Sequence, residues 1–262
     1  MKYVIITGAT GGLGKAFSYK MAEKGENLIL VGRTMEKLNN LKTNILDKFK
    51  GVDIKLFTCD LTDKVSREKL FNDIKDLNLQ ITKLINVAGV DTQMAFENYT
   101  QEKLLFQIKV NLEATISITK YVLDLKNGQL DILTVSSLCG VTPMPYFAVY
   151  SATKSALINF FDAIRYELKG KDVKISTLMP GSIPTRQDII EDIKKQGLTG
   201  KLSSKSPDYV VKVALKQLEK NKRHIVPGFY NKIVYFFSKI TPYSLQSKII
   251  AKKFSIKQKD AF

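Results

Sequence analysis

Short runs rich in β-branched and aromatic residues alternate with longer amphipathic windows along most of this chain, and this alternation constrains the fold more than any other feature. Strands separated by helices of such length are typical of βαβ units, which build a parallel sheet. Because crossovers between parallel strands are right-handed, the helices cover both faces of that sheet. Strands are expected at residues 3–7, 28–31, 54–58, 83–87, 129–136, 173–179 and 224–226.

Helices are expected between these runs, most clearly at residues 13–23, 35–49 and 148–169. The predicted fold class is therefore α/β: a Rossmann-like, doubly wound, mostly parallel seven-stranded sheet, followed by a C-terminal helical extension. Residues 1–226 are expected to form a single domain with a sizeable core, and residues 227–262 the extension. In such sheets ligands bind outside the carboxyl ends of the strands, so functional residues should follow the strands directly.

A glycine-rich stretch, TGATGGLG, follows the first strand and opens the first helix. This context is typical of dinucleotide binding, because glycine lets the backbone approach a pyrophosphate and the helix N-terminus offers it free N–H groups. The stretch fits two spacings, Gly8-Gly11-Gly14 and Gly8-Gly12-Gly14, and by itself does not choose between them.

The residues after the second strand bear on the choice of cofactor. An NAD-type site would place Asp or Glu about 20 residues beyond the glycines, where the carboxylate accepts hydrogen bonds from the ribose 2′-OH. Gly32 and Arg33 occupy that place here, and the first carboxylate, Glu36, is expected within the next helix. A guanidinium pairs bidentately with a 2′-phosphate, so the sequence favours NADP(H) over NAD(H).

A second polar group follows the fifth strand. Ser137 stands 13 residues before Tyr150, and Lys154 follows Tyr150 at i+4, on the same face of the expected helix. An ammonium beside a phenol favours the phenolate, so we expect the pKa of Tyr150 to fall from about 10 toward neutrality. With the serine hydroxyl nearby, these residues make a site able to donate a proton.

These motifs occur together and in order over nearly the whole chain, and on them the chain resembles the classical short-chain dehydrogenase/reductase family in its NADP(H)-dependent form. The matching segments are TGATGGLG at 7–14, CDLTD at 59–63, NVAG at 86–89, Asn111, Ser137, YSATK at 150–154 and PGSIPT at 180–185. NVAG departs from the commoner Asn-Asn-Ala-Gly but keeps Asn86 and Gly89. The resemblance and the chain length favour Gly8, Gly12 and Gly14 as the phosphate-binding set.

The resemblance implies roles for four catalytic residues. Tyr150 would be the general acid in carbonyl reduction and the general base in alcohol oxidation, while Lys154 would lower its pKa and hold the nicotinamide ribose. Ser137 would hydrogen-bond the carbonyl oxygen, where charge develops during hydride transfer. Asn111 would hold a water that links Lys154 to solvent.

The resemblance also implies which residues line the cofactor and the substrate. With Tyr150 and Lys154, the expected cofactor contacts are Gly8, Thr10, Gly12, Leu13, Gly14, Arg33, Asp60, Leu61, Asn86, Ala88, Gly89, Pro180, Gly181, Ile183 and Thr185. The irregular, polar segment 182–206 is expected to be a mobile substrate lid. The expected substrate contacts are Gln93, Met94, Val141, Met144 and Phe147, which are mostly apolar and favour an apolar ketone or aldehyde. Asn86 has a structural alternative, in which it ties neighbouring strands together.

Cysteine and histidine are too few for most metal chemistry. Cys59 and Cys139 form no CxxC pair, and His224 is the single histidine, which argues against a metal site and against a disulfide framework. The first strand begins directly after Met1-Lys2, and no apolar stretch approaches about 20 residues. We therefore expect no signal peptide and no membrane span, and a cytoplasmic protein.

Positive charge is concentrated near the C-terminus. Half of the formal net charge of +16 lies in residues 221–262, where nine Lys or Arg stand against one acid. Apolar side chains recur there at helical spacing, with Lys232 and Lys239 beside or opposite them: Phe229, Tyr230, Ile233, Val234, Phe236, Phe237 and Ile240. Such a helix can lie on an anionic membrane, pack against a second subunit or cover the substrate pocket, and the sequence leaves these alternatives open.

These features favour an NADPH-dependent carbonyl reductase, or alcohol dehydrogenase in reverse, that acts on a small-molecule carbonyl compound. A non-catalytic dinucleotide-sensing protein of the same fold is the alternative from another class, although a sensor needs no proton donor. A nucleotide-sugar epimerase needs a further domain, for which the roughly 80 residues after Pro180 leave little room. Nucleic-acid binding would rest on charge alone, without a recognition motif. The resemblance further implies a homo-oligomer, a dimer or a tetramer, packed through the helices that carry Asn111 and Tyr150.

Overall fold

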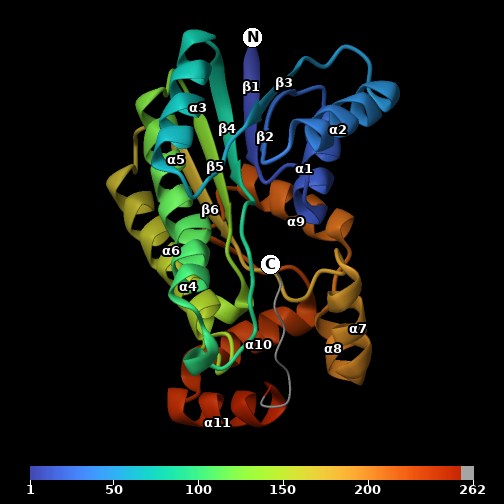
Figure 1. The fold of residues 1–262 in the computed structure, drawn as a ribbon, viewed down its shortest axis with the longest axis vertical. Coiled ribbons are helices and arrows are strands. Elements are labelled where there is room, and N and C mark those ends of the chain that lie inside the picture. The colour runs from blue at the N-terminus through green and yellow to red at the C-terminus, as the bar shows by residue number, and fades with distance from the viewer. Residues whose placement is uncertain (255–262) are drawn as a thin grey trace.

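A single parallel sheet organises the molecule. A computed structural model describes residues 1–254 of the chain, with side chains up to residue 252. Its strands are β1 (Lys2–Thr7), β2 (Asn27–Gly32), β3 (Ile54–Thr58), β4 (Gln80–Asn86), β5 (Leu130–Val135), β6 (Val173–Leu178) and β7 (His224–Ile225). They form one seven-stranded sheet in the order β3-β2-β1-β4-β5-β6-β7 (Figure 1). All seven predicted strands are present, and the predicted doubly wound fold is confirmed. The last part of the expected extension, 255–262, lies outside the described residues.

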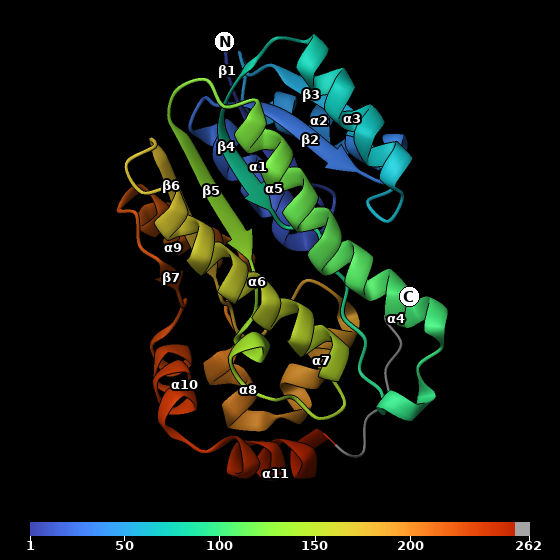
Figure 2. The ribbon, with the colours of Figure 1, turned by 90° about the vertical axis from the view of Figure 1, so that its left-hand side faces the viewer.

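Helices cover both faces of the sheet. On one face lie α1 (Gly12–Glu23), α2 (Met35–Lys48) and α9 (Pro207–Glu219). On the other lie α3 (Lys64–Asp76), α5 (Ala114–Asp124) and α6 (Ala148–Glu167), which Figure 2 shows from the front. The helix α4 (Gln101–Ile108) continues into α5 through a π-helical turn at Lys109–Glu113. The predicted helical windows correspond to α1, α2 and α6.

Alternation along the strands divides the core into two layers. In β1, Val4 and Ile6 are buried against the side covered by α1 and α9. Tyr3 and Ile5 are buried on the opposite side, against α5 and α6. Because both faces are covered, the strands read as continuous apolar runs, as parallel strands between two helical layers do.

Side-chain caps mark the beginnings of α3 and α9, and α1 differs from them. Asp63 starts α3 by accepting hydrogen bonds from the N–H groups of Val65 and Ser66. Ser206 starts α9 in the same way, with a proline in the first turn. Gly11 precedes α1 and provides no side-chain cap, so the first backbone N–H groups of α1 are open to a ligand.

Four helices lie beyond the carboxyl ends of the strands, at the lower end of Figure 1. They are α7 (Gln187–Lys195), α8 (Gly197–Ser203), α10 (Phe229–Ile240) and α11 (Tyr243–Phe254). Two of these helices, α7 and α8, occupy most of the segment 182–206, and its expected role as a substrate lid stays a prediction. Ile189, Ile190 and Ile193 give α7 a short amphipathic pattern that the surrounding polar residues conceal. Among the described helices, none combines the length and the apolar composition needed to cross a bilayer.

A polar cluster fastens α10 to the body of the protein. Tyr235 of α10 lies with its hydroxyl 2.6 Å from His224 Nδ1, and His224 Nε2 lies 2.9 Å from Asp162 Oδ1 on α6. Arg223 Nε donates to the same carboxylate at 2.7 Å. A neutral imidazole satisfies both contacts, because Nε2–H donates to the carboxylate while Nδ1 accepts from the tyrosine. Burial lowers the pKa of His224, and Asp162 offsets this effect only in part.

We expect His224→Gln to lower the free energy of unfolding by about 1–2 kcal/mol at neutral pH, the range for lost hydrogen bonds. The pH dependence of stability should weaken as well. Since the folded-state pKa of His224 is depressed, the unfolded state binds more protons, and the wild type loses stability as pH falls below about 6.5. Denaturant titrations at neutral and mildly acidic pH measure both effects. Equal pH slopes for the wild type and the variant would contradict this account.

Candidate active site

The candidate site lies at the carboxyl ends of β1, β4, β5 and β6, where ligands bind in parallel sheets. The strand order reverses between β1 and β4, whose last residues Thr7 and Asn86 are in register. Thr7 Oγ1 accepts hydrogen bonds from the N–H groups of Val87, at 3.1 Å, and Ala88, at 3.3 Å. The Thr7 hydroxyl thus joins the end of β1 to the start of the loop after β4.

The glycine turn after β1 packs directly against this loop. Gly8 has a φ of +63°, in the left-handed region that favours glycine. A Cβ on Gly8 would lie 2.8 Å from the Cα of Ala88, closer than real Cβ atoms approach a backbone. A Cβ on Gly14 would overlap the carbonyl oxygen of Gly8. Both positions therefore require glycine.

Gly12 and Gly11 differ in how much room each has for a side chain. A Cβ on Gly12 would overlap the side chain of Thr185, which comes from the segment after β6. A Cβ on Gly11 would meet only the Gly8 carbonyl oxygen, at an ordinary 3.4 Å. Packing therefore requires glycine at Gly8, Gly12 and Gly14, but not at Gly11. The contact with Gly12 also places Thr185 beside the turn.

Charged residues follow β2 and β3 at the same edge. Arg33 is exposed directly after β2, and Glu36 lies in the first turn of α2, as predicted. Hydrogen bonds from Thr62, and also the charge of Arg33, hold the pKa of Asp60 below its usual range. Arg33 and Asp60 therefore lie near each other. The other predicted contacts at this end are Thr10, Leu61 and the buried Leu13.

Two buried asparagines organise the end of β4. Asn86 Nδ2 donates to the hydroxyls of Thr119, at 3.1 Å, and Thr134, at 3.3 Å, and so ties β4 to α5 and β5. Asn111, in the π-helical turn, accepts from the N–H of Val90 at 2.8 Å and donates to its carbonyl at 2.9 Å. The contacts of Asn86 match its structural interpretation, and a direct contact with a cofactor stays a prediction.

Asn111, Gly89 and Lys154 lie together. A Cβ on Gly89 would come within 3.2 Å of Lys154 Nζ and 3.3 Å of Asn111 Oδ1. Asn111 Nδ2 also donates to the hydroxyl of Thr153 on α6, at 3.2 Å. The loop after β4 therefore faces the first turns of α6.

Ser137, Tyr150 and Lys154 meet at the end of β5. Lys154 is buried, with Nζ 2.9 Å from the carbonyl oxygen of Val135 and 5.7 Å from the centroid of the Tyr150 ring. The hydroxyl of Ser136 donates to the carbonyl of Lys154 at 2.8 Å and holds α6 against β5. Ser137, two residues beyond β5, lies close enough to Tyr150 to lower the pKa of its hydroxyl. The structure thus brings all four predicted catalytic residues to one edge of the sheet.

The expected fall in the pKa of Tyr150 was wrong. Burial raises the pKa of Tyr150, and the nearby negative charge of Asp91 adds to this effect. The side chain of Ser137 and the charge of Arg186 offset it only in part. Burial also lowers the pKa of Lys154, to about 8. Because the pKa of Lys154 lies below that of Tyr150, the lysine is already neutral at the pH where a phenolate would form, and it does not offset the cost of burying that phenolate.

The loop after β6 closes the site on another side. The carbonyl of Pro180 accepts from the N–H of Leu138 at 3.1 Å. A Cβ on Gly181 would meet the Ser203 carbonyl oxygen at 2.8 Å and Asn231 Nδ2 at 2.9 Å. The ends of α8 and α10 therefore pack on this glycine. The other predicted contacts of the loop are Ile183, which packs against the core, and Thr185.

The predicted substrate residues differ in their surroundings. The N–H of Met94 donates to the carbonyl of Tyr146 at 2.8 Å, which joins the loop after β4 to the loop before α6. The ring of Phe147 lies 6.2 Å from that of Tyr150. Gln93 is buried, and its Nε2 has no hydrogen-bond partner among the described residues. Gln93, Met94 and Phe147 thus belong to loops that border the site.

Val141 and Met144 follow β5. Val141 packs against a small core cluster formed by Ile158, Met179 and Val226, so its surroundings are those of a core residue. Met144 is half-buried in the loop before α6.

An ion pair between Arg186 and Asp91 was missed from the sequence. Arg186 Nη1 lies 2.8 Å from Asp91 Oδ1, and Nη2 lies 3.3 Å from Oδ2. The pair joins the segment before α7 to the loop after β4, and both of its charges act on Tyr150. No local pattern predicts it, because the partners are 95 residues apart.

Comparison with known proteins shows the family. Residues 2–194 match the family model described as short chain dehydrogenase, and the chain belongs to this family. A very-long-chain 3-oxoacyl-CoA reductase of Neurospora crassa is 31% identical over 236 residues, which cover 87% of this chain and 68% of the relative. The 17-beta-hydroxysteroid dehydrogenase type 3 of Homo sapiens is 29% identical over 190 residues, 70% of this chain. That match spans only 60% of the human protein.

Solved structures agree on the fold. A 7beta-hydroxysteroid dehydrogenase structure superposes with a TM-score of 0.83 at 24% identity, covering 95% of this chain and 96% of that one. A short-chain dehydrogenase from Sphingobium yanoikuyae in complex with NADPH gives a TM-score of 0.76 at 22% identity, covering 100% of this chain and 99% of that one.

The glycine packing predicts opposite tolerance at two neighbouring positions. Gly14→Ala should lower the free energy of unfolding by about 3 kcal/mol, because the new methyl group overlaps backbone that cannot yield. Gly11→Ala should lower it by less than about 1 kcal/mol, the cost of alanine at a helix start. Equilibrium denaturation of both variants measures the difference. Equal destabilisation would refute the packing described for Gly8, Gly12 and Gly14.

Proposed function

We propose that this protein is an NADPH-dependent carbonyl reductase, and in reverse an alcohol dehydrogenase, that acts on apolar ketones or aldehydes. The observation that carries the proposal is the meeting of Ser137, Tyr150, Lys154 and Asn111 at the ends of β4 and β5. The names of two relatives support it, because hydroxysteroid dehydrogenases and 3-oxoacyl-CoA reductases act on carbonyl or hydroxyl groups of largely apolar molecules.

The residues present fit a dinucleotide. Any side chain at Gly8, Gly12 or Gly14 would fill or distort the cradle after β1, while the first amides of α1 lack a side-chain cap and suit a pyrophosphate. Exposed Arg33 suits a 2′-phosphate on the adenosine ribose. These features support NADP(H) as the cofactor. When bound, the nicotinamide ring supplies or accepts the hydride.

Tyr150 moves the proton in the proposed reaction. In reduction its hydroxyl donates a proton to the carbonyl oxygen, and in oxidation the same oxygen takes the proton from the alcohol. A raised pKa keeps Tyr150 in its proton-bearing form, which suits reduction. Ser137 donates a hydrogen bond to the carbonyl oxygen and stabilises the charge that develops there.

Lys154 and Asn111 support this proton transfer. Lys154 Nζ reaches the region between Tyr150 and Gly89, where a ribose hydroxyl can accept its hydrogen bond. Asn111 holds the loop after β4 through both backbone groups of Val90, and so keeps Gly89 close to the lysine. Met94, Met144 and Phe147 offer apolar surface for the substrate, with Gln93 as a polar group among them.

Arg33→Asp should shift cofactor preference. Loss of a charge-assisted pair with the 2′-phosphate should raise KM for NADPH roughly tenfold to a hundredfold, with little change for NADH. Initial rates with both cofactors measure this effect. Lys37→Asp, at an exposed position on the next helix, is the matched control and should change neither value strongly. Equal effects of Arg33→Asp on both cofactors would rule out the assignment.

Tyr150→Phe should lower kcat by roughly a hundredfold to ten-thousandfold, the contribution typical of a general acid. NADPH should still bind with nearly unchanged Kd, because the ring remains. Turnover on a panel of ketones and aldehydes, together with NADPH titration, measures the two quantities. Tyr166→Phe, at an exposed position on α6, is the control. Retained turnover in Tyr150→Phe would remove this residue from the acid role, whereas a wild type that binds NADPH but reduces no carbonyl would favour the sensor.

A further inference from the structure

The apolar side of helix α10 is exposed at the surface of the protein. Its buried residues are polar, Asn231 and Ser238. Phe229, Phe236 and Ile240 are 79%, 61% and 62% exposed, and all three lie on the opposite side of the helix. The apolar stripe predicted from the sequence is therefore real, but it does not belong to the core.

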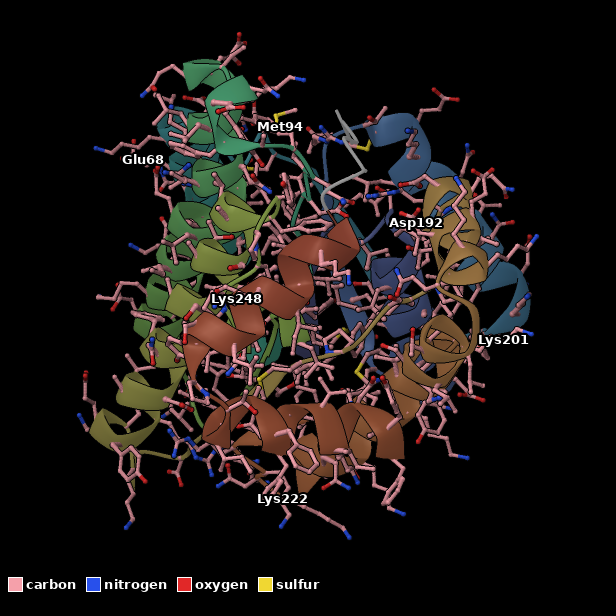
Figure 3. The ribbon with its side chains drawn as sticks, turned by 90° about the horizontal axis from the view of Figure 1, so that it is seen from below. Glu68, Met94, Asp192, Lys201, Lys222 and Lys248 are labelled. Atoms are coloured by element: carbon pink, nitrogen blue, oxygen red, sulfur yellow. The ribbon has the colours of Figure 1, made fainter. Side chains whose placement is uncertain are left out.

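The helix α11 also exposes apolar side chains and buries a polar one. Its buried Gln246 donates to the carbonyl oxygens of Ser238 at 2.9 Å and Thr241 at 2.6 Å. Leu245 and Ile249 are exposed. The two helices lie across the lower end of the molecule, toward the viewer in Figure 3, where Lys248 of α11 is labelled. The exposed apolar side chains of this surface, which we call the α10–α11 face, are Phe229, Ile233, Val234, Phe236, Phe237, Ile240, Tyr243, Leu245 and Ile249.

Hydrogen bonds prevent α10 from turning its apolar side inward. Asn231 Nδ2 donates to the carbonyl oxygens of Ser203, at 2.9 Å, and Pro227, at 2.8 Å. On the same inner side, Tyr235 is bonded to His224. Rotating the helix would leave these buried polar groups without partners, at a cost of about 1–3 kcal/mol for each group. An apolar face held outward in this way is typical of an interaction surface.

The charge of the face indicates its partner. Residues 229–254 contain five lysines and no acid. A second copy would bring the same positive charges against them, whereas an anionic lipid surface complements them. Lysine stems can lie along the apolar surface while their ammonium groups reach lipid phosphates. Lys239 lies at the edge of α10, with its Nζ 4.3 Å from the centroid of the Tyr235 ring.

We propose that the α10–α11 face docks on an anionic lipid bilayer, with its apolar side chains at the boundary between headgroups and acyl chains. Helices of this kind bind in the plane of the interface, and none of the described helices needs to cross it. The face lies beyond the carboxyl ends of the strands, at the same end of the molecule as the candidate site (Figure 1). If the proposed function holds, docking brings the site close to a reservoir of apolar carbonyl compounds, but docking itself does not depend on catalysis.

Co-sedimentation of the full chain with vesicles tests the docking. Vesicles of phosphatidylcholine mixed with phosphatidylglycerol should bind the protein, and vesicles of phosphatidylcholine alone should bind it far less. Phe236→Ser combined with Phe237→Ser should weaken binding to the mixed vesicles roughly tenfold or more, since each phenylalanine loses its buried area. Lys248→Gln combined with Lys252→Gln should weaken vesicle binding more at low salt than at high salt, because salt screens the attraction between lysine and lipid phosphate.

Matched variants make the test specific. Tyr166→Ser removes an exposed aromatic ring on α6, and Lys212→Gln with Lys216→Gln removes two exposed charges on α9, so both should bind vesicles like the wild type. All variants should unfold at the same denaturant concentration as the wild type, because the altered side chains are exposed. Equal binding to neutral and anionic vesicles, or no binding at low salt, would overturn the proposal. So would a phenylalanine variant that still binds vesicles but no longer self-associates, since the face would then be a subunit interface.

Discussion

The close approach of three backbone segments at the reversal of strand order is the constraint on which the rest of the site depends. Gly8 lies against Ala88 of the next loop and under Gly14 of α1, with no room for a side chain at either glycine. This contact lets the chain leave β1, turn at once into a helix and still pass beside the end of β4. The amides of α1 and the loop that carries Gly89 therefore face the same space, and a ligand can contact both.

From that contact outward, buried polar groups position the chemistry. Asn111 is hydrogen-bonded to both the N–H and the carbonyl of Val90, and so fixes the loop beside Lys154. Lys154 in turn is held at the end of β5 by a carbonyl, with the ring of Tyr150 close by. Because the side chains of Asn111 and Lys154 are buried, their hydrogen bonds are worth more than they would be in water, and their positions are well defined. The Tyr150 ring is only half-buried, but little water reaches its hydroxyl, and this desolvation raises its pKa, contrary to what the i+4 spacing suggested.

The sequence predicts the strands well, because each is a continuous apolar run between turns, and it predicts the meeting of Ser137, Tyr150 and Lys154 because all three follow one strand. It cannot predict what depends on distant partners. Arg186 and Asp91 are 95 residues apart, and the cost of burying Tyr150 depends on the whole surrounding shell. Helical periodicity identified the apolar stripe of α10, but it does not say which side of a helix is buried. Here Asn231 and Tyr235 decide the matter through hydrogen bonds to other elements.

Direct hydride transfer is the central claim, and isotope labelling tests it most directly. NADPH carrying deuterium at the transferable position of the nicotinamide ring is incubated with the protein and a panel of apolar ketones, and the alcohol products are examined by mass spectrometry. We expect one deuterium on the carbinol carbon, because the hydride passes from the ring to that carbon while the proton on oxygen comes from Tyr150. Products without the label, or no consumption of NADPH with any carbonyl compound, would contradict the proposed reaction.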